Sequence, residues 1–415
     1  MDVVHTRCAG IDISKYDAKV AVRIAKAGRV GAEVKVETYG SSTPQVLRLR
    51  DDLIAAHVTC VIMEATGDYW RTFYYLLEDA EFDILLANPR EVRNRPGRKT
   101  DVSDAQWLAE LGAFGLVNGS FVPPAPIRDL RALTRLRTHI TRDRGVEAQR
   151  LEKVLEDAGI KLSSVATDIT GVSGRAMLQA LCDGVIVEDI VEMARGALRN
   201  KKAELTQALQ GRFTTHHGFM VAMLLGRIDA CNDDIAALTS RIDVLMEPYR
   251  RAHDLLVTIP GISDRVADVI IAETGADMSV FPDAKHLASW AGVAPGSNQS
   301  SRTVKSAHTR PGDPYLKAAL GIVALAAARN KKTYFCAQYR RIATRRGPIK
   351  ALVAVESSII TACWYVLTRD TPHVDLGYDY FTRRRPDTAK TKAVQQLQAL
   401  GYDVTLSPAQ ESMAE

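Results

Sequence analysis

The first 124 residues alternate short β-rich runs with helical ones, and this alternation restricts the fold more than any other feature of the sequence. Five runs have the length and composition of strands, and they are predicted at 9–13, 18–24, 34–38, 60–64 and 83–87. The second and third, joined through a turn around Gly28, form a predicted hairpin that directly follows the first strand. The alternation predicts an α/β domain.

A proline-rich linker and a long helical region follow this domain. The linker is Phe121-Val-Pro-Pro-Ala-Pro, because consecutive prolines stop both helices and sheet ladders. The next helix is predicted over 127–158 and is strongly basic, with arginines at positions 128, 131, 135, 137, 142, 144 and 150. This helix is a candidate contact for RNA or DNA, although a solvated face of a coiled coil has the same composition.

A second helix carries an apolar seam at alternating three- and four-residue steps. Its members are Ile228, Cys231, Ile235, Leu238, Ile242 and Leu245. Such a seam indicates either a helical hairpin within the chain or a dimerising coiled coil, and the pattern alone does not choose between them. The segment between Ile160 and Arg227 is predicted to be helical and carries no recognisable chemistry.

A compact helical domain is predicted from about Leu255. It opens with Ile259-Pro-Gly-Ile, and a Pro-Gly turn between two helices resembles a helix-hairpin-helix that grips DNA phosphates. A plain helical turn has the same signature. The expected fold class is α/β plus all-α, divided into an N-terminal domain (1–126), a central helical coiled-coil region (127–250), a C-terminal helical domain (251–369) and a tail (370–415).

Composition is that of a soluble protein with local basic patches. The 415 residues are 25% charged with a formal net charge of +5, and the basic residues cluster at 90–99, 128–150 and 331–350. Six cysteines without zinc-like spacing are predicted to be free thiols, which fits the cytoplasm. The apolar stretches 320–328 and 351–367 are judged interrupted or too short for a membrane span, so no membrane association is expected.

Two strands each deliver one carboxylate. Asp12 lies near the end of the first strand in Ala-Gly-Ile-Asp-Ile-Ser-Lys, and Glu64 ends the later strand Cys60-Val-Ile-Met-Glu. The apolar flanks indicate buried strands, where an acid needs a partner or a metal. If the strands are neighbours, the two carboxylates converge.

Two further acids begin a helix. Asp101 and Asp104 are three residues apart, which places them on one helix face, although either one taken alone is more often a helix N-cap. Four carboxylates at one site repel one another unless cations neutralise them, and oxygen-only ligands favour Mg²⁺ or Mn²⁺. A site of this kind could support phosphodiester chemistry.

The order of these acids predicts a RuvC-like, ribonuclease-H-like domain. An Asp on the first strand, a hairpin, a Glu on the fourth strand and an Asp-x-x-Asp helix start are typical of that nuclease arrangement. The sugar-kinase and actin-like ATPase fold also opens with a strand, Asp and hairpin. It requires a second phosphate-binding strand pair and a glycine-rich adenosine loop, and neither is found.

The same residues resemble the transposases of the IS110 insertion sequences, also called bridge-RNA-guided recombinases. The N-terminal match consists of Gly-Ile-Asp-Ile-Ser-Lys at Asp12, Met-Glu-Ala-Thr-Gly-x-Tyr-Trp at Glu64 and Lys-Thr-Asp-x-x-Asp-Ala at Asp101 and Asp104. The C-terminal match consists of Ile-Pro-Gly-Ile at Pro260, Ala288-Ser-Trp-Ala-Gly-Val-Ala-Pro and Gly312-Asp-Pro-Tyr-Leu. The resemblance implies a DEDD metal site built from Asp12, Glu64, Asp101 and Asp104, and a serine that joins covalently to DNA.

The resemblance places that serine in Pro295-Gly-Ser-Asn-Gln-Ser-Ser-Arg. Spacing favours Ser300, with Ser301 as the near alternative and Ser297 as a distant one. The family often has a small glycine-containing step and a lysine after the serine, whereas this chain has Ser301-Arg-Thr-Val-Lys. The phosphate charge that develops during attack could be steadied by four nearby cations, or these could bind the backbone without specificity: Arg302, Lys305, His308 and Arg310.

The resemblance also implies partners. It implies donor and target DNA, a structured non-coding guide RNA that pairs with both, and dimers that assemble into a tetramer. The predicted function is therefore a DNA transposase that uses carboxylates, Mg²⁺ or Mn²⁺ and a phosphoserine intermediate. The alternatives are a metal-dependent nuclease or junction resolvase without serine chemistry, and a non-catalytic DNA-binding protein.

Overall fold

The computed structural model describes residues 2–26, 31–65, 67–92, 100–296, 298–300, 303–306, 308–309 and 311–407. Its internal contacts divide the chain into two compact units, Met1–Val122 and Pro123–Glu415, called here the N-terminal unit and the C-terminal unit. The division falls inside the proline-rich segment at 121–126, where consecutive prolines cannot continue a helix or a sheet ladder.

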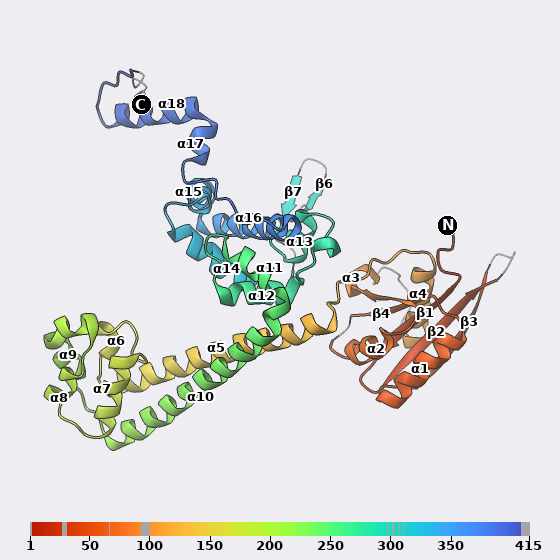
Figure 1. Ribbon diagram of the computed structural model, residues 1–415, viewed down its shortest axis with the longest axis horizontal. Helices are drawn as coiled ribbons and strands as arrows, with labels where there is room; N and C mark the ends of the chain where they lie inside the picture. Colours follow the sequence, from red (N-terminus) through yellow and green to blue (C-terminus); the bar gives the residue numbers. More distant parts are fainter. Residues whose placement is uncertain are drawn as a thin grey trace. The chain divides into compact units, whose positions relative to one another are not determined.

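The N-terminal unit is built on a five-stranded sheet, labelled β1 to β5 in Figure 1. The strands are β1 (Arg7–Ile13), β2 (Asp17–Ala25), β3 (Ala32–Gly40), β4 (Cys60–Glu64) and β5 (Asp83–Ala87). In the order β3-β2-β1-β4-β5, the pairs β3–β2 and β2–β1 are antiparallel, and the pairs β1–β4 and β4–β5 are parallel. All five predicted strands are confirmed, while the turn around Gly28 lies outside the described residues. This topology fits the RuvC-like arrangement.

Helices cover both faces of the sheet. They are α1 (Thr43–Ala55), α2 (Trp70–Leu77), α3 (Pro89–Val92) and α4 (Asp101–Ala113). Side chains from α1 and α2 share a core with Ile11 and Met63 on one face. Leu108 and Leu111 of α4 share a second core with Cys8 and Ile62 on the other face. Residues of a strand point alternately to the two faces, which is why both faces are apolar here.

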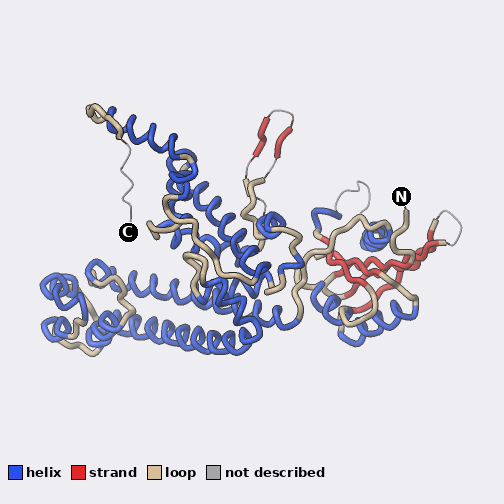
Figure 2. Tube along the Cα trace, turned by 45° about the horizontal axis from the view of Figure 1, so that its top comes forward, coloured by secondary structure: helices blue, strands red, loops and turns tan. Residues whose placement is uncertain are grey.

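The C-terminal unit begins with two long helices that lie side by side, α5 (Ala125–Asp157) and α10 (Thr215–Met246) (Figures 1 and 2). The predicted seam of α10 is buried in this pairing at Ile228, Ile235 and Ile242. The seam therefore packs within the chain, as in the hairpin alternative.

A helical cluster joins one end of α5 to one end of α10. It contains α6 (Leu162–Val165), α7 (Val172–Cys182), α8 (Val187–Glu192), the 3₁₀ helix Gly196–Lys201 and α9 (Lys202–Leu209). Its core includes Leu151 of α5 and Ile228 of α10, so it is continuous with the helix pair. The prediction that 160–227 is helical is confirmed.

The rest of the C-terminal unit consists mainly of further helices. The helices are α11 (Arg250–Val257), α12 (Asp264–Thr274), α13 (Ala284–Trp290), α14 (Pro314–Arg329), α15 (Tyr334–Arg346), α16 (Pro348–Arg369), α17 (Tyr380–Arg384) and α18 (Pro386–Ala399). Short 3₁₀ helices span Glu247–Tyr249 and Met278–Val280, and a two-stranded hairpin is formed by β6 (Asn298–Ser300) and β7 (Thr303–Ser306). All six cysteines of the chain are free thiols, as predicted.

Helix α16 corrects one prediction. The stretch 351–367 was judged interrupted or short, but α16 runs unbroken for 22 residues and is apolar enough to cross a membrane on length and composition alone. In this structure Val355, Ile359 and Cys363 are buried, and α16 packs against α13, α14 and α15. That is the environment of a core helix.

Candidate active site

Strands β1 and β4 bring Asp12 and Glu64 to neighbouring positions. Their parallel pairing extends to Ile11 opposite Met63, so the next residue of each strand is one of these acids. Both acids share a strand face with residues that pack under α4, because residues two apart point the same way. The predicted convergence of the two strand carboxylates is therefore built into the register.

Helix α4 begins with the other two acids in its first turn. Thr100 is the N-cap and accepts a hydrogen bond from the backbone N–H of Ser103, whose side chain in turn accepts one from the N–H of Thr100. Neither Asp101 nor Asp104 is therefore the cap of this helix. As acidic residues of the first turn, both interact favourably with the helix dipole.

Two glycines allow α4 to lie directly on the strands. A Cβ on Gly10 would come within 2.2 Å of the Ala105 carbonyl oxygen, and one on Gly112 within 2.2 Å of Ile62. The first contact lies near the start of α4 and the second near its end. Gly10 is two residues before Asp12, so this close approach sets the start of α4 beside the end of β1.

Electrostatics agree with this placement. Burial, together with repulsion from Asp101, Asp104 and Glu64, raises the pKa of Asp12 to about 6. The site thus gathers negative charge from two strands and one helix. The other three predicted ligands all contribute to the raised pKa of Asp12.

The donor set fits a hard divalent cation. The four side chains offer only carboxylate oxygens, which are the ligands that Mg²⁺ and Mn²⁺ prefer, and a cation would offset the mutual repulsion at Asp12. In the ranges the structure describes, no three acidic, histidine or cysteine side chains are gathered closely enough to hold one ion as they stand. The carboxylates are near one another but are not arranged as a closed coordination sphere.

The predicted nucleophile lies on the β6–β7 hairpin of the C-terminal unit. Ser300 is the last residue of β6 and pairs with Thr303 of β7, with an irregularity in register between Asn298 and Gln299. The side chains of Ser300 and Lys305 lie outside the described part of the chain, as do Ser297, Ser301, Arg302 and Arg310 entirely. His308 is exposed where the chain returns from the hairpin.

The hairpin rises from a base made by two glycine contacts. A Cβ on Gly296 would come within 2.1 Å of the His308 carbonyl oxygen, and one on Gly312 within 2.3 Å of the Gly292 nitrogen. The segments Ala288–Pro295 and Gly312–Leu316, which carry the C-terminal resemblance, therefore meet at this base. Only glycine leaves room for such backbone contact.

A buried ion-pair network supports this base and was not predicted. Asp313 caps α14 by accepting hydrogen bonds from the N–H groups of Tyr315 and Leu316, and it pairs with Arg135 of α5 at 2.9 Å. Arg135 also contacts Glu273 of α12 at 2.8 and 2.7 Å. An Asp directly before a proline that starts a helix is a sequence signal for the cap, whereas the arginine partners are more than a hundred residues away.

The basic helix is therefore partly committed to structure. Arg131 donates to the backbone carbonyl oxygens of Ala272 and Glu273, and buried Arg137 pairs with Asp268 at 2.8 Å. Together with Arg135, three of the seven arginines of this helix face protein rather than solvent. Contact of this helix with RNA or DNA stays a prediction.

The predicted Pro-Gly turn joins α11 and α12 as two successive helices. Gly261 has φ +96° and lies against α14, where a Cβ would come within 2.9 Å of the Val323 carbonyl oxygen. Ser263 and Asp264, at the start of α12, are exposed. The turn has the shape of a helical hairpin, and phosphate binding by its amides stays a prediction.

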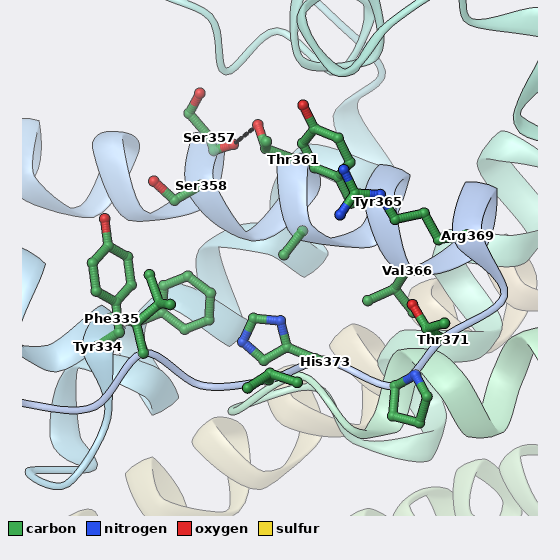
Figure 3. A pocket seen from close by; sticks show the side chains of 14 residues that line it. Tyr334, Phe335, Ser357, Ser358, Thr361, Tyr365, Val366, Arg369, Thr371 and His373 are labelled. Atoms are coloured by element: carbon green, nitrogen blue, oxygen red, sulfur yellow. Dashed lines mark hydrogen bonds between the residues drawn. The ribbon is translucent and has the colours of Figure 1, made fainter. Parts of the chain in front are cut away.

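A cavity of about 610 Å³ lies elsewhere in the C-terminal unit, between α15, α16 and the segment 371–376 (Figure 3). Phe335 and His373 lie against each other there, 5.8 Å apart between ring centroids, and burial lowers the pKa of His373. Hydroxyls of Ser358 and Thr361 are also drawn in its walls. Among the described residues no carboxylate lines this cavity, so its lining differs from that of the Asp12 site.

Comparisons with known proteins match two parts of the chain, one with the four acids and one with the β6–β7 hairpin. Residues 9–160, which include all four acids, match a family model described as "Transposase", the DEDD domain of IS110 elements. Residues 253–340, which include the β6–β7 hairpin, match the model "Transposase IS116/IS110/IS902 family".

Two curated relatives come from Streptomyces coelicolor. The IS110 insertion element 43.6 kDa protein is 32% identical over 150 residues, 34% of this chain and 36% of the relative. The IS117 mini-circle protein is 31% identical over 118 residues, 27% of this chain and 26% of the relative. The chain thus spans about a third or less of the length of each relative in these alignments. With one transposase model on the carboxylate domain and another on the hairpin domain, the chain belongs to the IS110 family of transposases.

Proposed function

We propose that this protein is a DNA transposase that cuts and rejoins DNA through a phosphoserine intermediate. The observation that carries the proposal is the convergence of Asp12, Glu64 and the first turn of α4, in a domain that matches transposases. The second transposase match covers the hairpin whose first strand, β6, ends in Ser300.

The carboxylates are proposed to hold the cation of the reaction. Mg²⁺ or Mn²⁺, when bound by Asp12, Glu64, Asp101 and Asp104, supplies positive charge that polarises a phosphodiester. The chain's own part is to fix these oxygens by strand register and by the Gly10 contact.

Ser300 is proposed to be the nucleophile. Its hydroxyl oxygen forms a bond to phosphorus, the bond from phosphorus to one deoxyribose oxygen breaks, and the DNA strand becomes a phosphoserine ester. The serine hydroxyl releases its proton, and the leaving deoxyribose oxygen takes up a proton. Attack of another deoxyribose hydroxyl on that ester rejoins DNA and restores the serine.

The carboxylates lie in the N-terminal unit and Ser300 lies in the C-terminal unit, and the proposed reaction uses both. Donor and target DNA are the proposed substrates. A structured non-coding RNA as guide and assembly of dimers into a tetramer follow from the family resemblance and are part of the same proposal. The N-terminal unit by itself supports a second function, a metal-dependent nuclease, because its carboxylates need no serine to favour hydrolysis.

The test is a covalent adduct. Purified protein is incubated with element DNA, the flanking non-coding RNA and Mg²⁺, and protein–DNA adducts that survive denaturation are quantified. We expect an adduct with wild type and none with Ser300→Ala or Asp12→Asn. Asp51→Asn, an exposed acid on α1, is the matched control and should form the adduct normally.

The outcomes separate the functions. Peptide mapping of the adduct after nuclease digestion identifies the modified serine, and modification of Ser301 would move the nucleophile by one residue. Free DNA ends without an adduct would replace the recombinase with the nuclease. Intact DNA under all conditions would leave a DNA-binding protein.

A further inference from the structure

A basic groove is lined by residues of α15 and of the C-terminal helices α17 and α18, and α17 lies between the other two helices in Figure 1. Its hollow measures about 560 Å³. Five cationic side chains line it, namely Arg341, Arg345, Arg384, Arg385 and Lys392. The other lining residues include three threonines and Phe381, and no acidic residue is among them.

Within the described part of the chain, no ion pair neutralises the cations of this groove. The two acids of the adjoining segment, Asp379 and Asp387, pair with Arg383 and Lys390, which do not line the groove. Within the described ranges, none of the five groove cations has a carboxylate oxygen within 4.0 Å. A hollow lined by one sign of charge concentrates the field and attracts anions.

Ring contacts hold part of this cationic surface in place. The Arg341 guanidinium lies 4.5 Å from the centre of the Phe381 ring, and that ring stacks on Tyr334 at 5.4 Å. Arg384 donates a hydrogen bond to the Tyr380 hydroxyl at 3.2 Å. Positioned guanidiniums bind anions with a smaller loss of side-chain entropy than free ones.

We propose that this groove binds the phosphodiester backbone of a nucleic acid. Guanidiniums and threonine hydroxyls are phosphate donors, whereas the one lining ring already contacts Arg341 and Tyr334 and offers little for base stacking. Exposed Arg346 and Lys350 continue the positive surface beyond the hollow, which suits an extended polyanion. The inference rests on the proposed function, because that function requires DNA and RNA.

Binding by phosphates predicts affinity without sequence preference. DNA and RNA share this chemistry, so the source is distinguished by two probes, a duplex DNA and a single-stranded RNA of equal length and random sequence. Full-length protein is titrated against each by fluorescence anisotropy over a series of salt concentrations.

The first variant is Arg341→Gln/Arg345→Gln/Arg384→Gln. We expect binding of at least one probe to weaken about tenfold or more, and the slope of log affinity against log salt to fall by about 2 to 3. Arg385→Gln/Lys392→Gln changes no ring contact and should lower the slope by about 1 to 2, so a folding defect at Phe381 cannot produce the result.

A control variant carries the same charge change on exposed residues of α5 and the helical cluster, Lys153→Gln/Arg195→Gln/Lys201→Gln. Unchanged binding by both groove variants, or an equal loss in the control, overturns the assignment. Loss of the DNA arm alone assigns DNA, and loss of the RNA arm alone assigns RNA. Displacement of both probes by a polyglutamate peptide of equal charge at equal concentration would replace nucleic acid with an acidic protein segment.

The two proposals fail separately. If wild type binds the probes through the groove but never forms a DNA adduct, the proposed function fails and the groove assignment stands. If wild type forms the adduct and the groove variants bind both probes as wild type does, the groove assignment fails alone.

Discussion

Glu273, fully buried on α12, accepts two hydrogen bonds from Arg135 of α5 at 2.8 and 2.7 Å. This bidentate contact joins the long helix to the helices that carry the β6–β7 hairpin, because Arg135 also pairs with Asp313 at the start of α14. Arg131 contacts the same carboxylate at 3.0 Å. The Glu273 carboxylate thus binds two arginines of α5, and this network supports the base of the hairpin that carries Ser300.

Breaking this contact should destabilise the protein and disturb the serine. Arg135→Ala leaves Glu273 and Asp313 with fewer partners, and removal of one member of a buried pair costs about 3 to 5 kcal/mol. The measurement is urea unfolding with the adduct assay in parallel. Lys153→Ala, at an exposed position of the same helix, is the control. It should change the free energy of unfolding by no more than about 0.5 kcal/mol and leave the adduct yield unchanged. Equal stability of the two variants would contradict the role given to Arg135.

Gly10→Ala should impair DNA cleavage beyond its effect on folding. The new Cβ would meet the Ala105 carbonyl oxygen at 2.2 Å, so α4 must shift, at a cost of about 1 to 3 kcal/mol, and carry Asp101 and Asp104 with it. Thermal melting and adduct yield at a temperature where the variant stays folded provide the measurement.

Gly145→Ala is the matched control for that substitution. Gly145 lies within helix α5 with no atom near its Cβ position, so alanine should stabilise the protein by about 0.5 to 1 kcal/mol. A wild-type adduct yield from Gly10→Ala would show that the start of α4 does not need its present position.

Divalent cations should stabilise the N-terminal unit through the four carboxylates. Mg²⁺ that binds only the folded state raises the melting temperature, and saturation at about 100 times its dissociation constant adds about 2.7 kcal/mol. We expect this shift in wild type and in Asp51→Asn, and a smaller shift in Asp12→Asn. Calorimetry without DNA measures the shift. A chelator should reverse it. Equal shifts in all three proteins would show that the cation does not bind at this site.

Glu356 should make the protein less stable as the pH rises. It is buried on α16, one carboxylate oxygen has no hydrogen-bond partner, and burial raises its pKa. The folded state therefore holds the proton to a higher pH than the unfolded state does. Stability falls as the pH rises from the ordinary glutamate pKa through the raised one, and stays lower above it.

Glu356→Gln removes that dependence. At neutral pH the variant should be more stable than wild type by about 1 to 2 kcal/mol, and the two should converge in acid. Chemical denaturation at a series of pH values measures the difference, with exposed Glu152→Gln as the control. A constant difference at every pH would show that ionisation of Glu356 is not its cause.

The sequence was sufficient to predict the strands and the start of α4, because these elements follow from local apolar patterns and a helix start at Asp101. Convergence of Asp12 with Glu64 was also predictable from their equal positions at strand ends. Partners distant in sequence were not. A run of arginines shows that a helix is basic, but it does not show that Glu273 or Asp268 will pair with it.

Two further features escaped the sequence for specific reasons. The seam of α10 has the same period whether its partner is α5 or a second chain, so Ile235 and Ile242 could not reveal which. Ser300 and Ser301 are consecutive, and spacing from the neighbouring motifs along the chain does not choose between them. The role of either serine stays a prediction.

The paired helices α5 and α10 also act as a ruler. At 1.5 Å per residue, the 33 residues of α5 span about 50 Å, and the helical cluster packs on one end of this length. Seven residues removed from both helices would shorten this reach by about 10 Å with only about 20° of rotation. The length of the pair therefore sets the distance between the helical cluster and α12, independently of the chemistry at either end.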